Sequence, residues 1–304
     1  MNNRILAVIV TYNRLSMLQR CIQHILNQTE ECDLLIVDNY SCDGTEQYVK
    51  DIINNRINYI KTFKNIGGAG GFNLGMRWAV EQNYEFIWLM DDDCFPSINA
   101  LEELINADKL LNGKYGWLSS VSLWKDGLEC KMNRPKLKKS FYEYIHLLKN
   151  GIVQAEQATF VSLFIRRNII EKYGLVIKEF FIWGDDIEFT RRISVRNKVP
   201  CFVVGKSVVT HFMNANNGSD IATDDITRIE RYRYAFRNEG YLYRQEGIRG
   251  YIYYCAKCLW NLIKIFVYGK DNKLKRCRIL IFGVFDSLFF NPSIEFNKYF
   301  SRYK

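Results

Sequence analysis

Three consecutive carboxylates, Asp91, Asp92 and Asp93, come directly after the apolar run 86–90. That run has the length and composition of a strand buried on both faces. Because side chains alternate along an extended chain, we expect Asp91 and Asp93 on one side and Asp92 on the other. Two carboxylates on one side suit an ion such as Mg²⁺, which binds a few carboxylates together with substrate phosphates. The alternative interpretation is a solvated acidic turn that caps the next helix.

A second pair of carboxylates, Asp185 and Asp186, follows Trp183 and Gly184 and precedes an expected helix. A carboxylate there could take the proton of an attacking alcohol, which is general base catalysis. The alternative is that these carboxylates only stabilise the helix, because they lie at the positive, N-terminal end of its dipole. His211 follows the apolar segments 202–204 and 208–210. Its imidazole could complete a metal site begun by two carboxylates, or it could be structural.

The elements that position these residues alternate between strand and helix patterns. Strands are predicted at 5–10, 33–37, 57–60 and 86–90, with amphipathic helices between them, and further strands at 116–121 and 158–165. This alternation indicates a mostly parallel sheet with its site along the carboxyl edge. The glycine-rich segment 65–72 is predicted to be a loop that enters a helix. It is neither of the two common phosphate-binding fingerprints, so it is either a tight turn or a place where backbone approaches a ligand.

Composition limits the class of protein. The chain has 304 residues, 48% of them hydrophobic, which is enough for a substantial core. Nine cysteines without repeated spacing indicate reduced thiols and a cytoplasmic location, and the first apolar run is too short for a signal peptide. Residues 231–304 contain 15 Lys and Arg but only 5 Asp and Glu, so the positive net charge of the chain, +9, is concentrated in this C-terminal region. Positive charge so far from the expected site argues against a nucleic-acid-binding protein.

The C-terminal region combines basic with apolar residues. In the predicted helix 251–268, Lys257, Asn261 and Lys264 form one narrow polar stripe on a wide apolar face. We expect this region to lie on an anionic membrane surface, which places the protein peripherally on the inner face of a bacterial membrane. Additional attraction is expected from the basic residues that follow, Lys270, Lys273, Lys275, Arg276 and Arg278. The alternative is a helical packing or dimerisation domain, and a homo-oligomer remains open.

Four motifs in this order give the chain a family resemblance. The segment 10–14 (VTYNR), the strand end at Asp38, the segment 65–72 (NIGGAGGF) and the triple aspartate resemble the inverting family 2 glycosyltransferases with a GT-A fold. The resemblance covers roughly residues 3–215 and is greatest to bacterial galactofuranosyltransferases. It implies an α/β GT-A nucleotide-sugar-binding domain over residues 1–220, with a mostly parallel central sheet. Residues 221–304 then form a basic, aromatic helical region.

The resemblance also implies roles for individual residues. Asp91, Asp93 and His211 would bind Mn²⁺ or Mg²⁺, and Asp186 would be the general base. In related enzymes the tryptophan directly precedes the aspartates, whereas here Gly184 lies between them. Thr11 and Asp38 would contact the uridine of the donor, and the glycine segment would lie along its diphosphate. The full set of donor-binding residues would be Thr11, Asn13, Arg14, Asp38, Asn65, Gly67, Gly68, Asp92, Trp183 and Asp185.

These expectations predict an inverting, metal-dependent enzyme. It would transfer galactofuranose from UDP-galactofuranose to a hydroxyl of a growing bacterial surface glycan (O-antigen, capsule or cell-wall galactan) whose acceptor is lipid-linked. An alternative is a rhamnosyltransferase that uses dTDP-rhamnose. An alternative of another class is a non-catalytic protein of the same fold that binds nucleotide sugars or glycans.

Overall fold

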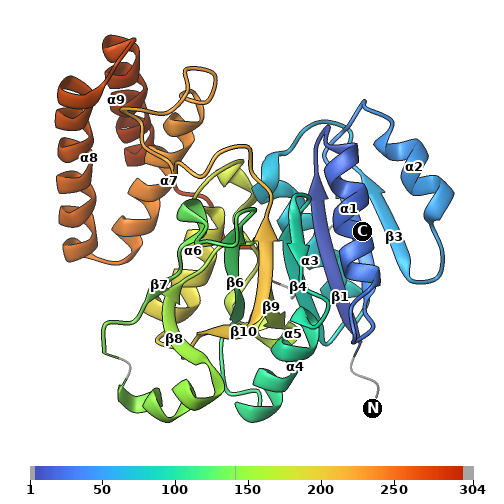
Figure 1. Ribbon diagram of the computed structural model, residues 1–304. Coiled ribbons are helices and arrows are strands. Elements are labelled where there is room, and N and C mark those ends of the chain that lie inside the picture. The colour runs from blue at the N-terminus through green and yellow to red at the C-terminus, as the bar shows by residue number, and fades with distance from the viewer. Residues whose placement is uncertain (1–3, 141, 297–304) are drawn as a thin grey trace.

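The computed structural model describes residues 4–140 and 142–296. The first half of the chain alternates strands and helices as the sequence predicts (Figure 1). Its elements are β1 (Ile5–Thr11), α1 (Leu15–Leu26), β2 (Asp33–Asp38), α2 (Thr45–Ile52), β3 (Ile57–Lys61), α3 (Gly67–Glu81), β4 (Phe86–Asp91), β5 (Cys94–Pro96) and α4 (Ala100–Leu110).

The middle of the chain is less regular, and it is followed by three long helices. Its elements are β6 (Leu118–Trp124), η1 (Lys131–Asn133), β7 (Lys136–Leu137), η2 (Tyr142–Asn150), β8 (Ile152–Gln157), β9 (Leu163–Arg166), α5 (Arg167–Tyr173), η3 (Lys178–Phe180), α6 (Asp185–Arg191), η4 (Arg192–Arg196) and β10 (Phe202–His211). The C-terminal helices are α7 (Arg231–Gln245), α8 (Ile248–Tyr268) and α9 (Lys273–Phe289).

One sheet forms the centre of the molecule, with strand order β3-β2-β1-β4-β9-β6-β10-β8-β7, and β5 pairs with β10. Strands β3, β2, β1 and β4 are parallel, and so are β6 and β10. Strand β9 lies antiparallel between β4 and β6, which therefore run in the same direction. The predicted mostly parallel sheet is confirmed, and the carboxyl ends of β1, β2, β4, β6 and β10 share one edge.

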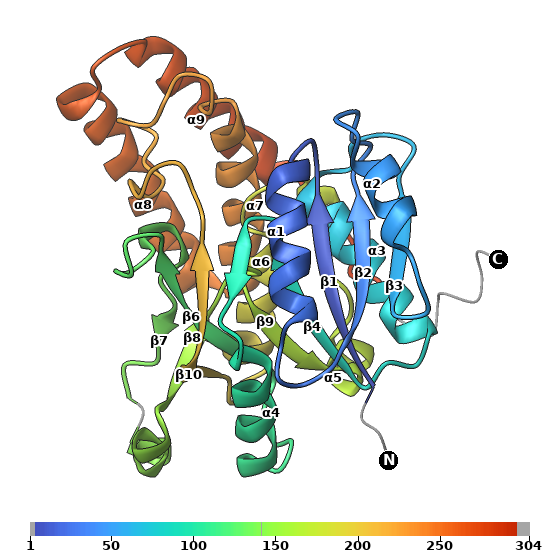
Figure 2. The same ribbon diagram turned by 45° about the vertical axis from the view of Figure 1, so that its right-hand side comes forward.

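Helices cover both faces of this sheet (Figures 1 and 2). Alternate residues of β1 contribute to different cores: Ile5, Ala7 and Ile9 pack with α1, α2 and α4, whereas Leu6 and Val8 pack with α3, α5 and α6. All seven residues of β1 are buried. A strand covered on both sides needs apolar residues at successive positions, which explains the continuous hydrophobic run in the sequence.

The glycine-rich segment differs from its predicted form. Helix α3 begins at Gly67, so most of the expected loop is helical. The later glycines allow this helix to lie close to β1, because a Cβ on Gly71 would lie 2.5 Å from Val10 and one on Gly75 would lie 2.4 Å from Val8. Only Gly67, with a φ of +75°, needs the backbone freedom of glycine.

Strand boundaries in the middle of the chain also differ from the predictions. The predicted strand 158–165 is observed only as β9, and β8 precedes it without having been predicted. Polar residues interrupt the alternation in β8, whose sequence is IVQAEQ, because this strand lies near the edge of the sheet.

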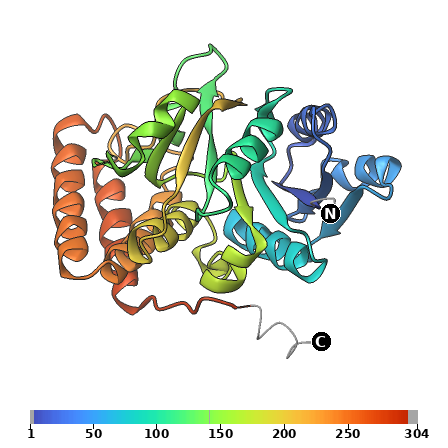
Figure 3. The same cartoon turned by 90° about the horizontal axis from the view of Figure 1, so that it is seen from below.

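The C-terminal helices α7, α8 and α9 have their own small core, built around Phe236, Tyr254 and Leu280. They stand beside the sheet domain, with α8 outermost (Figures 1 and 3). The chain then returns to the sheet domain, where Glu295 binds Arg77 and Lys178 and its backbone oxygen accepts a hydrogen bond from the nitrogen of Leu175 at 2.9 Å. No helix within residues 4–140 and 142–296 is long and apolar enough to cross a bilayer.

Candidate active site

The polar residues singled out in the sequence meet at the carboxyl edge of the sheet. Thr11 ends β1, Asp38 ends β2, Asp91 ends β4 and His211 ends β10. The register is Val10 beside Asp91 and Thr11 beside Asp38. Strand β5 turns back along β10, so that Cys94 pairs with His211. This reversal brings a strand end from late in the chain next to the aspartates.

The three aspartates have different partners. Asp92 is 3% exposed and accepts hydrogen bonds from the Thr11 hydroxyl at 2.7 Å and from Arg14 at 2.9 Å. Arg14 also donates to Asp93 at 2.7 Å and so links the two carboxylates. Asp91 remains partly exposed. Thr11 therefore holds Asp92, because the buried Thr11 hydroxyl donates its hydrogen bond to that carboxylate.

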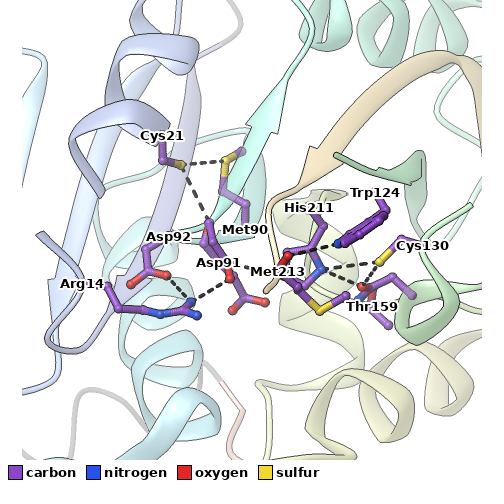
Figure 4. A network of polar contacts seen from close by, with 12 residues as sticks. Arg14, Cys21, Met90, Asp91, Asp92, Trp124, Cys130, Thr159, His211 and Met213 are labelled. Atoms are coloured by element: carbon purple, nitrogen blue, oxygen red, sulfur yellow. Dashed lines mark hydrogen bonds and ion pairs between the residues drawn. The ribbon is translucent and has the colours of Figure 1, made fainter. Parts of the chain in front are cut away.

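His211 lies on the other side of the aspartates (Figure 4). Its Nε2 atom is 3.0 Å from Oδ1 of Asp93, and its Nδ1 atom is 2.7 Å from Oδ1 of Asn133. The Cys130 sulfur lies 3.8 Å from the same Nδ1 atom. Both ring nitrogens thus face an acceptor oxygen. A neutral imidazole has a single N–H, so the second contact is favourable only with a second proton or a cation between the two atoms.

Burial and mutual repulsion change the pKa values of these groups. Burial, together with the charges of Asp93, Asp92 and Asp186, raises the pKa of Asp91 to about 7. Burial also raises the pKa of Asp92 to about 6, although Arg14 opposes the change. Burial alone would raise the pKa of Asp93. The hydrogen bond and charge of His211, together with the charge of Arg14, outweigh burial and lower this pKa. Burial disfavours the charged form of His211, yet its contacts with Asp93 and Cys130 raise the pKa to about 10.

Asp91, Asp93, Cys94 and His211 each place a possible ligand atom within 4.8 Å of the others. The arrangement fits a divalent cation. With Nδ1–H donating to Asn133, the Nε2 proton lies between His211 and Asp93, and a divalent cation that replaces this proton would satisfy both atoms. Burial raises the pKa of the Cys94 thiol well above its usual range, so Cys94 stays a neutral, weak ligand. Carboxylates with one imidazole suit Mn²⁺ or Mg²⁺ better than a metal that prefers thiolates.

The residues expected to contact the nucleotide lie at the ends of β1 and β2. Asp38 is fully buried, accepts a hydrogen bond from the Ser41 nitrogen at 2.7 Å and another from the Tyr59 hydroxyl at 2.7 Å. The backbone nitrogen of Asn13 donates to the Ser41 hydroxyl at 2.9 Å. Asn13 and Asp38 therefore belong to one hydrogen-bonded network that shapes the two loops.

The start of α3 lies beside these loops. The Asn65 side chain accepts a hydrogen bond from the Gly67 nitrogen at 2.8 Å, which fixes the first turn of the helix. The Gly67 oxygen accepts one from Asn39 at 2.9 Å. A Cβ on Gly68 would meet no atom within 4 Å, so open space lies against this backbone position. An anion there would face the positive end of a helix of 15 residues.

The second carboxylate pair lies at the start of α6. Burial and the charge of Asp186 raise the pKa of Asp185 well above its usual range, and Asp91 adds to the effect. Burial raises the pKa of Asp186 to about 6. The charge of Asp186 also raises the pKa of Asp91, and the charge of Asp91 raises that of Asp185, so the two predicted chemical centres are close enough to interact. Trp183 packs edge-on against Tyr232 of α7, with ring centroids 4.9 Å apart.

Three residues around His211 and Asp93 were not predicted from the sequence: Cys94, Cys130 and Asn133. Cys94 directly follows the aspartates, but only the antiparallel pairing of β5 with β10 brings it to His211. Cys130 and Asn133 lie at a short 3₁₀ turn in a region without periodic pattern. No signal in the sequence connects that turn with a strand end about 80 positions later.

Comparison with known proteins agrees with this geometry. Residues 6–110 match the sequence profile of Glycosyl transferase family 2. Galactofuranosyltransferase GlfT1 of Mycobacterium tuberculosis is 26% identical over 316 residues, which span 90% of this chain and 97% of that protein. The dTDP-rhamnosyl transferase RfbF of Shigella flexneri is 26% identical over 209 residues, which span 63% of this chain and 64% of that protein.

Among solved structures, GalNAc-T7 with UDP, GalNAc and Mn²⁺ superposes with a TM-score of 0.66 at 14% identity. The superposition covers 99% of this chain and 56% of that protein. At this identity it establishes the fold, and the fold is the predicted GT-A arrangement. The chain is therefore a glycosyltransferase, in which residues 6–110 match the profile of Glycosyl transferase family 2.

Proposed function

We propose that this glycosyltransferase is an inverting, metal-dependent galactofuranosyltransferase that uses UDP-galactofuranose and extends a bacterial surface glycan. The observation that carries the proposal is the alignment with GlfT1, which runs through nearly the whole of both chains. The resemblance of the segment 65–72 to galactofuranosyltransferases supports the same donor. The alignment with RfbF supports the second candidate, a rhamnosyltransferase that uses dTDP-rhamnose.

In the proposed mechanism, Asp186 is the general base. It accepts the proton of the acceptor hydroxyl while the hydroxyl oxygen forms a bond to the anomeric carbon and the bond from that carbon to the diphosphate breaks. Attack opposite to the leaving group inverts the anomeric configuration. The raised pKa of Asp186, about 6, still leaves it ionised at neutral pH and makes it a better proton acceptor than an ordinary aspartate.

The leaving diphosphate needs stabilisation of its negative charge. A Mn²⁺ or Mg²⁺ ion held by Asp91, Asp93 and His211 would supply it as a Lewis acid. Arg14 lies 2.7 Å from Asp93 and adds a fixed positive charge at the same edge. The start of α3, with Asn65, Gly67 and Gly68, would orient the diphosphate. Because the leaving group departs as an anion, no carboxylic acid is needed to protonate it.

The remaining donor contacts are proposals as well. Asp38 and Asn13 would shape the pocket for uridine, with Thr11 holding Asp92 in place. Asp92 and Asp185 would face the donor sugar, and Trp183 would support them from its contact with α7. We also propose a domain boundary at residue 220, because β10 ends at His211 and α7 begins at Arg231.

The experiment that tests the proposal is donor turnover by purified protein with Mn²⁺. UDP-galactofuranose, UDP-galactopyranose, UDP-glucose and dTDP-rhamnose are offered in parallel with a galactose-terminated lipid acceptor, and release of nucleoside diphosphate is measured. Selective release from UDP-galactofuranose, lost with EDTA and reduced about 10²–10⁴-fold in Asp186→Asn, is the expected result. Preference for dTDP-rhamnose would establish the second candidate. No release from any donor, with donor binding retained, would favour a non-catalytic binding protein.

We further propose that the C-terminal helices rest on an anionic membrane surface that presents the lipid-linked acceptor. Large apolar side chains are exposed along both outer helices, among them Trp260 and Phe266 on α8 and Phe285 and Phe289 on α9, at 56%, 59%, 58% and 72% exposure. The predicted polar stripe of α8 faces inward instead, since Lys257 binds Glu239 at 2.6 Å and Lys264 binds Asp220. Exposed apolar side chains gathered on one face in this way mark a binding surface.

The charges around this apolar face suit anionic lipid. Lys270, Lys275 and Arg278 are exposed beside it. Arg276 was expected to contribute, but it is 2% exposed and its guanidinium binds Asp271 and the backbone oxygens of Ile221 and Asp224. That expectation is wrong, because the buried guanidinium holds the loop before α7 in place.

Sedimentation with vesicles tests the membrane proposal. We expect binding to phosphatidylglycerol-containing vesicles that weakens with salt, and weaker binding in Trp260→Glu. Ile53→Glu is the matched control, because Ile53 is also an exposed apolar residue, at 51%, but lies at the end of α2. Absence of salt-sensitive binding, together with a dimer in solution that Trp260→Glu dissociates, would show that a second copy of the chain covers this face.

A further inference from the structure

The segment that leads into the second carboxylate pair has an unusual backbone. Phe181 has φ +65° and ψ −63°, and the Ile182 nitrogen donates to the Phe180 oxygen at 2.7 Å. These values define a γ-turn with positive φ, the rare and strained form of that turn. Trp183 follows with φ +61° and Gly184 with φ +87°, and α6 begins at Asp185. Two non-glycine residues with positive φ are strained and persist only where their surroundings hold them.

Helix α7 of the C-terminal region supplies that support. Asn238 is fully buried, and its Nδ2 atom lies 3.0 Å from the oxygen of Phe180, 3.2 Å from that of Ile182 and 2.8 Å from that of Trp183. The two N–H bonds of one side-chain amide are therefore shared among three carbonyls of the strained turn. Within the turn, the Ile182 nitrogen also donates to the Phe180 oxygen, so this carbonyl is held both from inside the turn and from α7.

Arg237 fixes the Asn238 amide and extends the same contact. Its guanidinium donates to Oδ1 of Asn238 at 2.9 Å and to the oxygens of Glu179 and Phe180 at 2.8 and 3.2 Å. Because Oδ1 accepts these bonds, the NH₂ group of Asn238 is directed toward the turn. Phe181 of the turn also packs against Tyr234 of α7, with ring centroids 5.2 Å apart.

The turn also contacts the start of α3. The Ala69 nitrogen donates to the Phe181 oxygen at 3.2 Å, and a Cβ on Gly67 would lie 2.0 Å from that oxygen. The turn thus lies between the glycine-rich start of α3 on one side and α7 on the other. Its position determines where Asp185 and Asp186 stand relative to the backbone of Gly67 and Gly68.

We infer that Asn238, assisted by Arg237, is a positioning residue for the reaction: it holds the strained 180–184 turn so that the carboxylate of Asp186 faces the donor side of the site. The C-terminal helices are then part of the catalytic apparatus as well as a docking region. This inference rests on the proposed role of Asp186 as the general base. A shift of the base by about 1 Å is enough to lower turnover about 10²-fold.

Asn238→Ala and Asn238→Asp test the inference. Both remove the NH₂ donor, and the aspartate additionally places a negative charge against three carbonyl oxygens. We expect kcat to fall about 10²-fold, with little change in the KM for the donor and in Mn²⁺ binding followed by EPR. Tyr254→Phe is the matched control, because it removes a buried hydrogen bond of 2.9 Å from Tyr254 to Phe236 within the same helices but touches no residue of the turn. It should lower the melting temperature and leave kcat unchanged.

A second variant keeps the test decisive where Asn238→Ala folds poorly. Arg237→Lys keeps the charge but loses the planar group that binds Asn238 and two carbonyls together, and a smaller fall of kcat is expected. Adding Phe181→Gly to Asn238→Ala should restore part of kcat, because glycine adopts a φ of +65° without strain. A purely structural role would lower stability alone and predicts no such recovery.

The outcomes separate this inference from the proposed function. If Asp186→Asn retains full turnover, the proposed base is wrong and the inference ends with it. If Asp186→Asn is inactive while both Asn238 variants lose only stability, as Tyr254→Phe does, the base stands and the positioning role is refuted. A rise in donor KM without loss of kcat in the Asn238 variants would also overturn the inference, because it would assign Asn238 to donor binding.

Discussion

Gly67 and Gly68 are neighbours whose substitution by alanine should have opposite effects on stability. Gly68 has open space where a Cβ would lie, and it is within the first turn of α3. Alanine is favoured over glycine in a helix by up to about 1 kcal/mol. Gly68→Ala should therefore leave the free energy of unfolding unchanged or raise it by that amount, which corresponds to a melting temperature higher by about 2 °C.

Gly67→Ala should be destabilising for two separate reasons. Its φ of +75° costs a residue with a Cβ roughly 1–2 kcal/mol. The new Cβ would also lie 2.0 Å from the Phe181 oxygen, which is a backbone atom and cannot rotate away. The turn before Asp185 has to shift, so both stability and turnover should fall.

Activity separates the two glycines in another way. If the diphosphate of the donor lies against Gly68, the methyl group of Gly68→Ala occupies the space that the diphosphate needs. The KM for the donor and the Kd for UDP should then both rise, although the variant is at least as stable as the original protein. Thermal unfolding with and without UDP, together with initial-rate kinetics, provides both values. An unchanged KM and Kd in a well-folded Gly68→Ala would refute the proposal that the donor lies at the start of α3.

Three other predictions concern charge. Because the base has to be ionised, kcat should fall below an apparent pKa near 6, the value to which burial raises Asp186, and a pH profile that is flat down to pH 5 would contradict this. Arg192→Met removes the buried partner of Glu188, whose side chain is 1% exposed, and should lower the free energy of unfolding in urea by about 3 kcal/mol. Arg196 also binds Glu188 but has a side chain 24% exposed, so Arg196→Met should lower it by less than about 1 kcal/mol. Equal losses would argue against a special role of the buried pair. The pKa of Glu295 is lowered from 4.5 by Lys178, Asn73 and Arg77, against the effect of burial. The ionised carboxylate therefore stabilises the fold above pH 4.5, and this stabilisation is lost as the pH falls. The difference in melting temperature between the protein and Glu295→Gln should be larger at pH 7 than at pH 4.

The sheet domain could be predicted from the sequence because its signals are local. Residues buried on both faces of a parallel strand form unbroken apolar runs, and β1, β2 and β4 appear as such runs. The triple aspartate could be placed at a strand end for the same reason. The glycines of α3 suggest a loop when only the sequence is considered. In the structure they allow contact with Val8 and Val10 of a neighbouring strand, and such tertiary packing leaves no local signal.

The parts that could not be predicted depend on contacts between distant segments. Asn133 meets His211 only because β6 and β10 are neighbours in the sheet. Asn238 is an ordinary polar residue in a helical pattern, and only the positive φ of Phe181 and Trp183 gives its amide three carbonyls to bind. In α8 the stripe of Lys257, Asn261 and Lys264 was identified correctly, but its direction depends on Glu239 and Asp220, which lie on other elements.

The balance of charge at the carboxyl edge connects these observations. Five carboxyl groups gather there, and the cations that contact them directly within the described residues are Arg14 and His211. Burial and mutual repulsion raise the pKa of Asp91 to about 7, so full ionisation of the group is unfavourable without further positive charge. A diphosphate would add negative charge to the same place. Its binding is therefore linked to that of a divalent cation, since each reduces the repulsion that the other would meet, and by reciprocity each must increase the affinity for the other.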